Sequence, residues 1–307
     1  MREIGISPHF SRDKFVPLQT KQRYSTRDIS SEVFLTLFFR GFVPFLSLAD
    51  FVSRNKNLQV ADLQRLKSCF KELVTATTSN HQKPRYCLWL GDCSPKEIKD
   101  MPLCYERVEK VREFRMASKS AGTRKLADTP TRFHVENMPD SSSIIIPKVS
   151  SEKRKYVPMG FINKGTLASD LVFLIPNASL YHFGILESNV HMAWMRAVCG
   201  RLEMRYRYSK DVVYNNFPWP SPTPEQQAKI ESTAQAILDA RALYPDSSLA
   251  DLYDPTLMPK ELLLAHRQND RAVMQTYGFS LKMTESECVA ELFRLYTKIG
   301  LCCVDRQ

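Results

Sequence analysis

The sequence predicts an α+β protein in which a mixed α/β region is followed by a small all-α region. Between residues 84 and 220, short apolar runs separated by turn residues alternate with helical segments. After residue 221, three segments with helix-capping signals follow one another without a strand-like run. The chain has 307 residues, 43% of them hydrophobic and 25% charged, which is enough material for two apolar cores.

The first 84 residues form a divergent N-terminal segment to which the sequence assigns no fold and no chemistry. Its hydrophobic run Val33–Val52 has nearly the length of a membrane span, but an arginine, a proline and an aspartate interrupt it. These interruptions favour buried strand or helix pieces over a membrane span. Apolar residues then recur at helical spacing from Leu63 to Leu73, which predicts a helix there.

The middle region, residues 85–220, predicts short strands interrupted by two helices. The first helix begins with Ser94 as N-cap and Pro95 as its first residue, and ends with Gly122 just beyond it. The second helix runs from Ser188 to Cys199 and ends at a glycine. Strands are expected in residues 85–91, 143–150, 156–162, 170–176 and 180–186.

The last region, residues 221–300, predicts three amphipathic helices that form a small bundle or cap. Thr223 with Gln226, and Thr284 with Glu287, have the spacing of capping boxes. The helix between these two ends at Gly278.

The net charge of +10 is unevenly distributed. After residue 220 the basic residues are outnumbered and the net charge is −3, so the first 220 residues carry +13. A basic body suits nucleic acid or another anionic surface, although a merely basic surface remains an alternative.

Several chemistries lack their sequence signals. The ten glycines include no G-x-G pattern, which excludes a dinucleotide fingerprint. The eight cysteines include no C-x-x-C pair, so they predict reduced thiols in a cytosolic protein. The stretch NNFPWP superficially resembles a base-gripping methyltransferase loop, but Phe217 follows Asn216 where that loop has proline. We therefore assign no catalytic residue and no metal or cofactor ligand.

The stretch GRLEMRYRYS predicts a strand with one polar face. Residues two apart in a strand point the same way, so Glu203, Arg205 and Arg207 are expected to project together. A carboxylate can accept a hydrogen bond from cytosine N4, and a guanidinium can donate two to guanine. The pair Glu203 and Arg205 could thus read one C·G base pair. The alternative is an exposed ion pair that contributes little energy.

Two further basic clusters are candidates for phosphate contacts. Arg112, Arg115 and Lys119 are expected within one helical face. The second cluster lies in a turn between strands and comprises Lys148, Ser150, Ser151, Lys153, Arg154 and Lys155. The alternative for each cluster is a solvated charged surface.

Long stretches of this sequence closely resemble the C-terminal part of the MmeI-like restriction-modification enzymes. They include NVHMAWMRAVCGRLEMRYRYSKDVVYNNFPWP and KLADTPTRFHVENMPDSSSIIIPKVSSEKRKYVPMGF. Members of that family are single-chain bacterial proteins that combine a nuclease, an adenine N6-methyltransferase, a target recognition domain and a helical C-terminal domain. The resemblance implies that residues 85–220 are a partial target recognition domain and residues 221–300 the helical domain.

The resemblance also implies roles for particular residues. In the family, paired residues just after CGRL select a base pair, with Glu-x-Arg and Lys-x-Asp as alternative pairs. This chain carries Glu203 and Arg205 at those positions, and Arg207 is a second candidate for base contact. S-adenosylmethionine, and Mg²⁺ for cleavage, are expected only in the full-length enzyme, because the motifs for them would lie upstream.

The function implied is sequence-specific recognition of double-stranded DNA for a bacterial adenine methyltransferase, by a fragment that lacks catalysis alone. It would act in the bacterial cytoplasm, associated with the nucleoid and not with a membrane. One alternative is the recognition subunit of a split enzyme, with a separate methyltransferase chain as partner. Another is a remnant that binds protein and not DNA.

Overall fold

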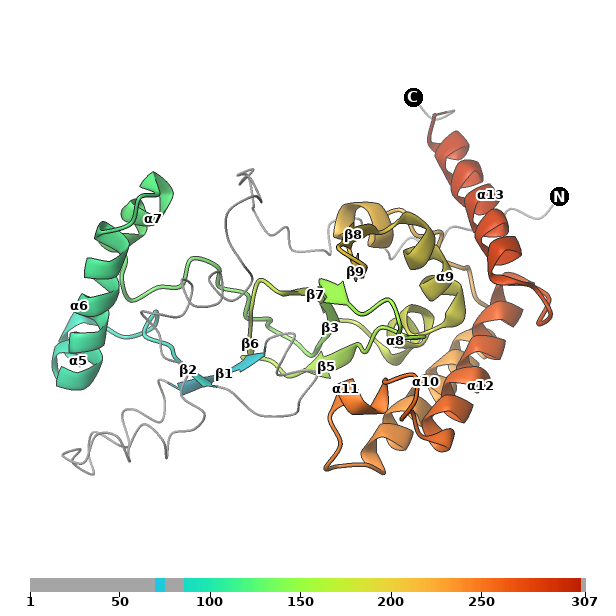
Figure 1. The fold of residues 1–307 in the computed structure, drawn as a ribbon, viewed down its shortest axis with the longest axis horizontal. Coiled ribbons are helices and arrows are strands. Elements are labelled where there is room, and N and C mark those ends of the chain that lie inside the picture. Colours follow the sequence, from blue (N-terminus) through green and yellow to red (C-terminus); the bar gives the residue numbers. More distant parts are fainter. Residues whose placement is uncertain (1–69, 75–85, 305–307) are drawn as a thin grey trace.

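The computed structural model describes residues 70–74 and 86–304. The run Val33–Val52 therefore lies outside the described residues. Figure 1 shows a helical lobe at one end, small sheets in the middle, and long helices at the other end. This arrangement confirms the predicted α+β class, with a mixed α/β region before an all-α region.

Nine strands form three small sheets in the described residues. They are β1 Phe70–Val74, β2 Tyr86–Leu88, β3 Ser143–Pro147, β4 Val149–Ser150, β5 Gly160–Ile162, β6 Leu167–Ala168, β7 Val172–Pro176, β8 Gly200–Leu202 and β9 Arg205–Arg207. The strand orders are β2-β1-β6, β5-β3-β7 and β4-β9-β8.

The helices of the described residues are distributed over all three parts of the molecule. They are α5 Pro95–Lys99, α6 Pro102–Met116, α7 Ala121–Lys125, α8 Leu180–Leu186, α9 Asn189–Val198, α10 Pro224–Ala242, α11 Leu249–Leu252, α12 Lys260–Tyr277 and α13 Glu285–Val304. A 3-10 turn, Leu126–Asp128, follows α7, and a π-helical turn, Lys210–Tyr214, follows β9.

The predicted long helix that starts at Ser94 is three helices. Ser94 caps α5 as expected, with Glu97 completing the capping box. Pro102 then begins α6, and Met101 before it has a non-helical backbone, because proline disfavours the helical conformation in the preceding residue. Gly122 does not close the helix but lies inside α7, which Ser120 caps.

Strand β1 corrects the end of the helix predicted over residues 63–73, of which residues 63–69 lie outside the described residues. Its residues pair antiparallel with β2 and parallel with β6, and Leu73 is aligned with Leu167. Leu73 is buried there. Pairing with two strands that are distant in sequence overrides the local helical spacing, which carries no information about such partners.

The segment LYHFGIL is helix α8 and not the predicted strand. Its last four residues, from Phe183 to Leu186, are all buried. A helix buried on every side shows no helical periodicity, so its sequence cannot be distinguished from a buried strand. Ser179 and His182 form the capping box that begins it.

The capping signals of the all-α region are confirmed. Thr223 and Gln226 bond reciprocally at the start of α10, and Thr284 and Glu287 do so before α13. Gly278 ends α12 with φ of 71°, the left-handed conformation that glycine adopts without strain.

One apolar core joins the middle region to the helical region. It runs from Ile144 and Ile146 in β3, through α8 and α9, to Leu292 in α13. Ile145 points to the opposite face of β3, into a smaller cluster with Val172. Strand β3 is therefore buried on both faces, and the two regions fold around shared contacts.

Gly184 allows α8 to approach α10 closely. A Cβ atom at this position would lie 2.6 Å from Cγ2 of Ile230. We expect Gly184→Ala to lower the free energy of unfolding by about 1–3 kcal/mol, because the stiff, buried Ile230 cannot move aside. Urea denaturation measures the change. The matched control is Gly160→Ala, whose Cβ would meet nothing within 4 Å. If both variants lost the same free energy of unfolding, the close contact of Gly184 with Ile230 would not be the cause.

Candidate functional site

The stretch GRLEMRYRYS, residues 200–209, begins with a β-hairpin. Strands β8 and β9 pair antiparallel, with Leu202 opposite Arg205, so that Glu203 and Met204 make a two-residue turn. Strand β4 pairs with the other edge of β9, with Val149 opposite Arg207. The hairpin is thus the outer part of a three-stranded sheet.

Alternation along β9 anchors the hairpin to the core. Tyr206 and Tyr208 are buried, whereas Arg205 and Arg207 are exposed. The hydroxyl of Tyr208 lies 3.1 Å from Nε2 of the buried His191. The prediction that Arg205 and Arg207 share an exposed face is therefore confirmed.

Glu203 departs from the predicted strand, because it lies in the turn. Its carboxylate nevertheless lies beside the guanidinium of Arg205, whose Nη2 donates to Oε2 at 2.8 Å. Both side chains are exposed, so this ion pair contributes less than about 1 kcal/mol. A ligand that offers both groups better partners could separate them at little cost.

The turn holds Glu203 in a strained conformation, with φ of 56°. Only its first residue has positive φ, the pattern of a type II′ turn, which prefers glycine there. We expect Glu203→Gly to raise the free energy of unfolding by about 1 kcal/mol, after a small loss from the exposed ion pair. Thermal unfolding measures this gain. Leu202→Ala is the control on the same hairpin, because it leaves the strained turn unchanged. If Leu202→Ala raised the free energy of unfolding as much as Glu203→Gly, the assignment of strain to Glu203 would be wrong.

Arg201, which the sequence reasoning missed, braces the hairpin. Its guanidinium lies 4.1 Å from the centroid of the Tyr206 ring, and its Nη1 donates to the carbonyl of Met204 at 3.2 Å. Arg201 is opposite Tyr206 across the hairpin. The signal that could have indicated this role is the position of Arg201 within GRLEMRYRYS, five residues before Tyr206.

The loop after β4 leaves the same sheet at the turn end of the hairpin. This follows from the register, since β4 passes from the position of Arg207 to that of Tyr206. Lys153 and Lys155 are exposed, and Ser151 and Arg154 are partly exposed. The structure therefore brings together, on the neighbouring strands β4 and β9, the basic loop of residues 151–155 and the hairpin with Arg205 and Arg207.

Two residues of that predicted cluster are less accessible. Ser150 is opposite Tyr206, on the inner face of the sheet, and is only 5% exposed. Its Oγ has no hydrogen-bond partner among the described residues. Burial lowers the pKa of Lys148, whose Nζ lies 4.9 Å from the centroid of the Phe173 ring. The proposed roles of both residues stay predictions.

Arg115, one residue of the cluster predicted around α6, serves the local fold. Arg115 donates to three backbone carbonyls, those of Leu126, Thr129 and Arg132, at 2.7 to 2.9 Å. It therefore fastens α6 to the chain that follows. Lys119 lies beyond the end of α6, so the expectation of one continuous helical face with Arg115 is wrong.

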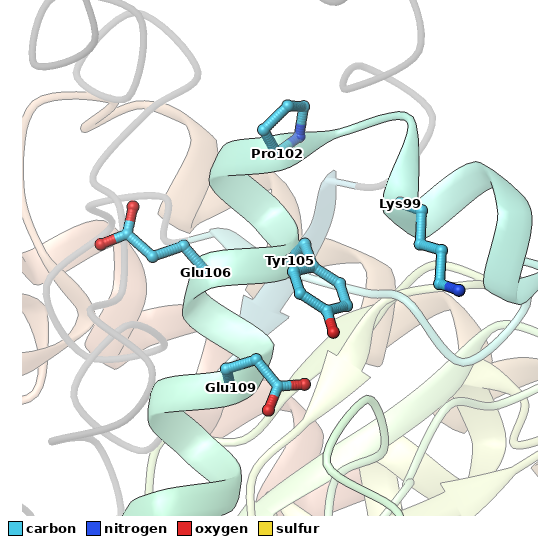
Figure 2. A pocket seen from close by; sticks show the side chains of 5 residues that line it. All are labelled: Lys99, Pro102, Tyr105, Glu106 and Glu109. Atoms are coloured by element: carbon cyan, nitrogen blue, oxygen red, sulfur yellow. The ribbon is translucent and has the colours of Figure 1, made fainter.

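A pocket on α6 is separate from the hairpin. Lys99, Pro102, Tyr105, Glu106 and Glu109 line it, and Figure 2 shows Tyr105 and Glu109 close together on the helix. Its two carboxylates already face cations, because Glu106 pairs with Lys110 and Glu109 with Arg112. These i,i+3 and i,i+4 pairs are typical of a solvated helix surface.

The stretch NNFPWP connects the middle region to α10. The Phe217 ring is buried, and Tyr277 of α12 donates to the carbonyl of Pro218 at 2.8 Å. The side-chain amide of Asn216 donates to the backbone carbonyl of Asp211 at 3.0 Å. These contacts fix NNFPWP between the middle region and the helical region, and they use its residues for packing and backbone support.

A buried polar network, which the sequence reasoning also missed, joins the same two regions. Glu187, at the end of α8, accepts from Arg241 of α10 at 2.8 Å and from the backbone N–H of Met159 at 2.7 Å. Arg241 also donates to Tyr253, whose hydroxyl lies 2.7 Å from Nε2 of His266. Burial raises the pKa of Glu187 to about 7, although Arg241 opposes this rise.

Within residues 70–74 and 86–304, no three His, Cys, Asp or Glu side chains gather as a metal site would require. In the same residues, no helix combines the length and apolarity of a membrane span.

Fold and site together define an α+β module, with a mixed α/β part and a helical part around a shared core, that presents a basic β-hairpin. The family model described as MmeI, target recognition domain, matches residues 48–221, and that described as MmeI, C-terminal domain, matches residues 222–301. The chain belongs to the MmeI family through these two domains. The first match begins upstream of residue 85, and the expected boundaries at 84/85 and 220/221 stay a prediction.

Two relatives illustrate the similarity. DNA methyltransferase A of Bacillus subtilis (strain 168) is 38% identical over 230 residues, which are 75% of this chain and 26% of that protein. The Type IIL restriction-modification enzyme MmeI, solved in complex with DNA, is 42% identical with a TM-score of 0.75, covering 80% of this chain and 33% of that one. The chain thus spans between a quarter and a third of these relatives.

Proposed function

We propose that this chain is the sequence-reading module of a site-specific DNA adenine methyltransferase, and that its β8–β9 hairpin enters the DNA major groove. The observation that supports this most is the exposed hairpin with Arg205 and Arg207 on one face and Glu203 at its tip. The major groove is wide enough for a two-stranded ribbon. The relationship to MmeI, which is solved with DNA, supports the same partner.

Glu203 and Arg205 read one C·G pair in this proposal. The Glu203 carboxylate accepts from cytosine N4 while the Arg205 guanidinium donates to guanine O6 and N7. Their mutual ion pair at 2.8 Å shows that the two groups reach the same place. Arg207, two residues further along the exposed face, contacts a second base pair.

The loop beside the hairpin contacts the DNA backbone. Lys153 and Lys155 are exposed there, and Ser151 supplies a hydroxyl. Arg154 and Lys148 contribute positive charge from partly buried positions. Ser150 lies on the inner face of the sheet, so its side chain would have to become exposed before it could contact a phosphate.

Methyl transfer would need residues beyond those described. The sequence has no G-x-G pattern, and Phe217 stands where a base-gripping methyltransferase loop has proline. We therefore assign S-adenosylmethionine and Mg²⁺ to a catalytic part, whether in a longer protein or in a separate partner chain, and we place the module at the bacterial nucleoid. Incubating the chain alone with S-adenosylmethionine and DNA should give no N6-methyladenine; methylation would overturn this division of roles.

DNA titration tests the proposed partner. We expect the chain to bind duplex DNA at low salt, with affinity that falls as salt rises by a slope of about −0.9 per phosphate contacted. Lys153→Gln combined with Lys155→Gln should flatten this slope without altering base preference, whereas Lys229→Gln on α10 should leave it unchanged. Absence of binding at low salt would refute the proposed function.

A further inference from the structure

Met204 is an apolar side chain held in solvent at the hairpin tip. It is 71% exposed, the highest value among large hydrophobic side chains of the described residues. Leu202, on the same face as Arg205, is 42% exposed. The tip therefore combines two apolar side chains with the charged pair Glu203 and Arg205.

Turn formation does not explain this choice of residues. Two-residue hairpin turns favour glycine, asparagine or aspartate, and none of these is present here. The chain instead accepts φ of 56° at Glu203 and places methionine next to it. Local strain of this kind persists where the surrounding structure enforces it, and it is concentrated at functional sites.

The surrounding structure also fixes the Met204 backbone. Arg201 donates to the Met204 carbonyl at 3.2 Å while stacking on the Tyr206 ring. Tyr206 is buried, so the brace is tied to the core. The tip thus presents Met204 in a defined place rather than on a loose loop.

We infer that Met204 contacts the C5-methyl group of a thymine in the base pair next to the one read by Glu203 and Arg205. The inference rests on the proposed function. If the hairpin enters the major groove, its tip reaches the base edges, and the thymine methyl is the apolar group exposed there. Methionine is flexible and polarizable, which suits contact with a methyl group. Met204 is thus a specificity determinant that recognises a methyl group by apolar contact, whereas Glu203 and Arg205 recognise a base pair by hydrogen bonds.

Selection from two random duplex libraries tests the inference without knowledge of the site. One library contains thymine and the other contains uracil, which lacks only the methyl group. The wild-type chain should prefer thymine at a position next to the C·G pair, and uracil should reduce this preference about fourfold, the factor expected for burying one methyl group. Met204→Ala should lose the thymine preference and keep the C·G preference, and Met204→Leu should retain both.

Leu257→Ala is the matched control, because Leu257 is 67% exposed but lies in the helical region. It should bind both libraries as the wild type does. If Met204→Ala keeps every base preference of the wild type, the inference is overturned while the proposed function stands. If the wild-type chain selects no DNA at all, both are overturned. Unchanged melting temperatures exclude misfolding as the cause of a lost preference.

Discussion

Replacing Glu203 with Lys and Arg205 with Asp is expected to switch the preferred base pair at one position of the DNA site from C·G to G·C. The exchange reverses which residue donates and which accepts, while the net charge of the pair stays the same. A good bidentate pair is worth about 1–3 kcal/mol of discrimination, so the preference should change by about 5- to 150-fold in each direction. Selection from a random duplex library, followed by titration of the two matched duplexes, measures it.

The matched control exchanges another exposed ion pair. Glu106→Lys combined with Lys110→Glu reverses a pair on α6, far from the hairpin in Figure 1, and should leave every base preference unchanged. Unchanged preference in the hairpin variant would remove the base-reading assignment. Equal loss of affinity for all sequences would instead make Glu203 and Arg205 phosphate contacts or structural residues.

Arg241→Met is expected to destabilise both domains together, by about 3–5 kcal/mol. The substitution leaves the buried carboxylate of Glu187 without its cation and frees the carbonyl of Met159, to which Arg241 donates at 2.7 Å. Because the apolar core is continuous from β3 to α13, unfolding should remain a single transition. Chemical denaturation followed by Trp fluorescence and circular dichroism measures both the loss and its cooperativity.

This loss should grow as pH rises above about 7, the pKa of Glu187 in the wild-type fold. Without Arg241, which opposes the rise of that pKa, the Glu187 carboxyl stays neutral in the folded variant at a pH where it ionises in the folded wild type. The folded variant then keeps a proton that the unfolded chain and the folded wild type have lost, so its stability relative to the wild type falls with pH.

Two controls separate the buried charge from lost packing. Adding Glu187→Gln to Arg241→Met should recover part of the stability and remove the pH dependence, because no carboxyl remains to titrate. Arg294→Met, which removes an exposed partner of Glu291, should cost less than about 1 kcal/mol. A double variant as pH-dependent as Arg241→Met would show that another group is responsible.

Local signals predicted much of the helical region and part of the site. The capping boxes at Thr223 and Thr284 and the glycine at residue 278 act within a few residues, so the sequence alone locates the helix ends. Alternation in RYRY likewise places Arg205 and Arg207 outside and Tyr206 inside, because a strand alternates its faces whatever its partners are.

The tertiary structure decided what depends on distant partners. Strand β1 exists because β2 and β6 pair with it, and α8 is helical although its burial on all sides hides its period. Glu203 lies in a turn because the register of β8 against β9 leaves two residues unpaired.

The contact of Glu187 with Arg241 joins residues 54 positions apart, so no local spacing in the sequence predicts it. The sequence by itself therefore determined the helix ends of the all-α region, the two faces of β9 and the identity of the charged pair, since each depends on neighbours along the chain. Only folding decided where that pair stands, what braces it and how the two domains are fixed, since each depends on residues brought together from distant segments.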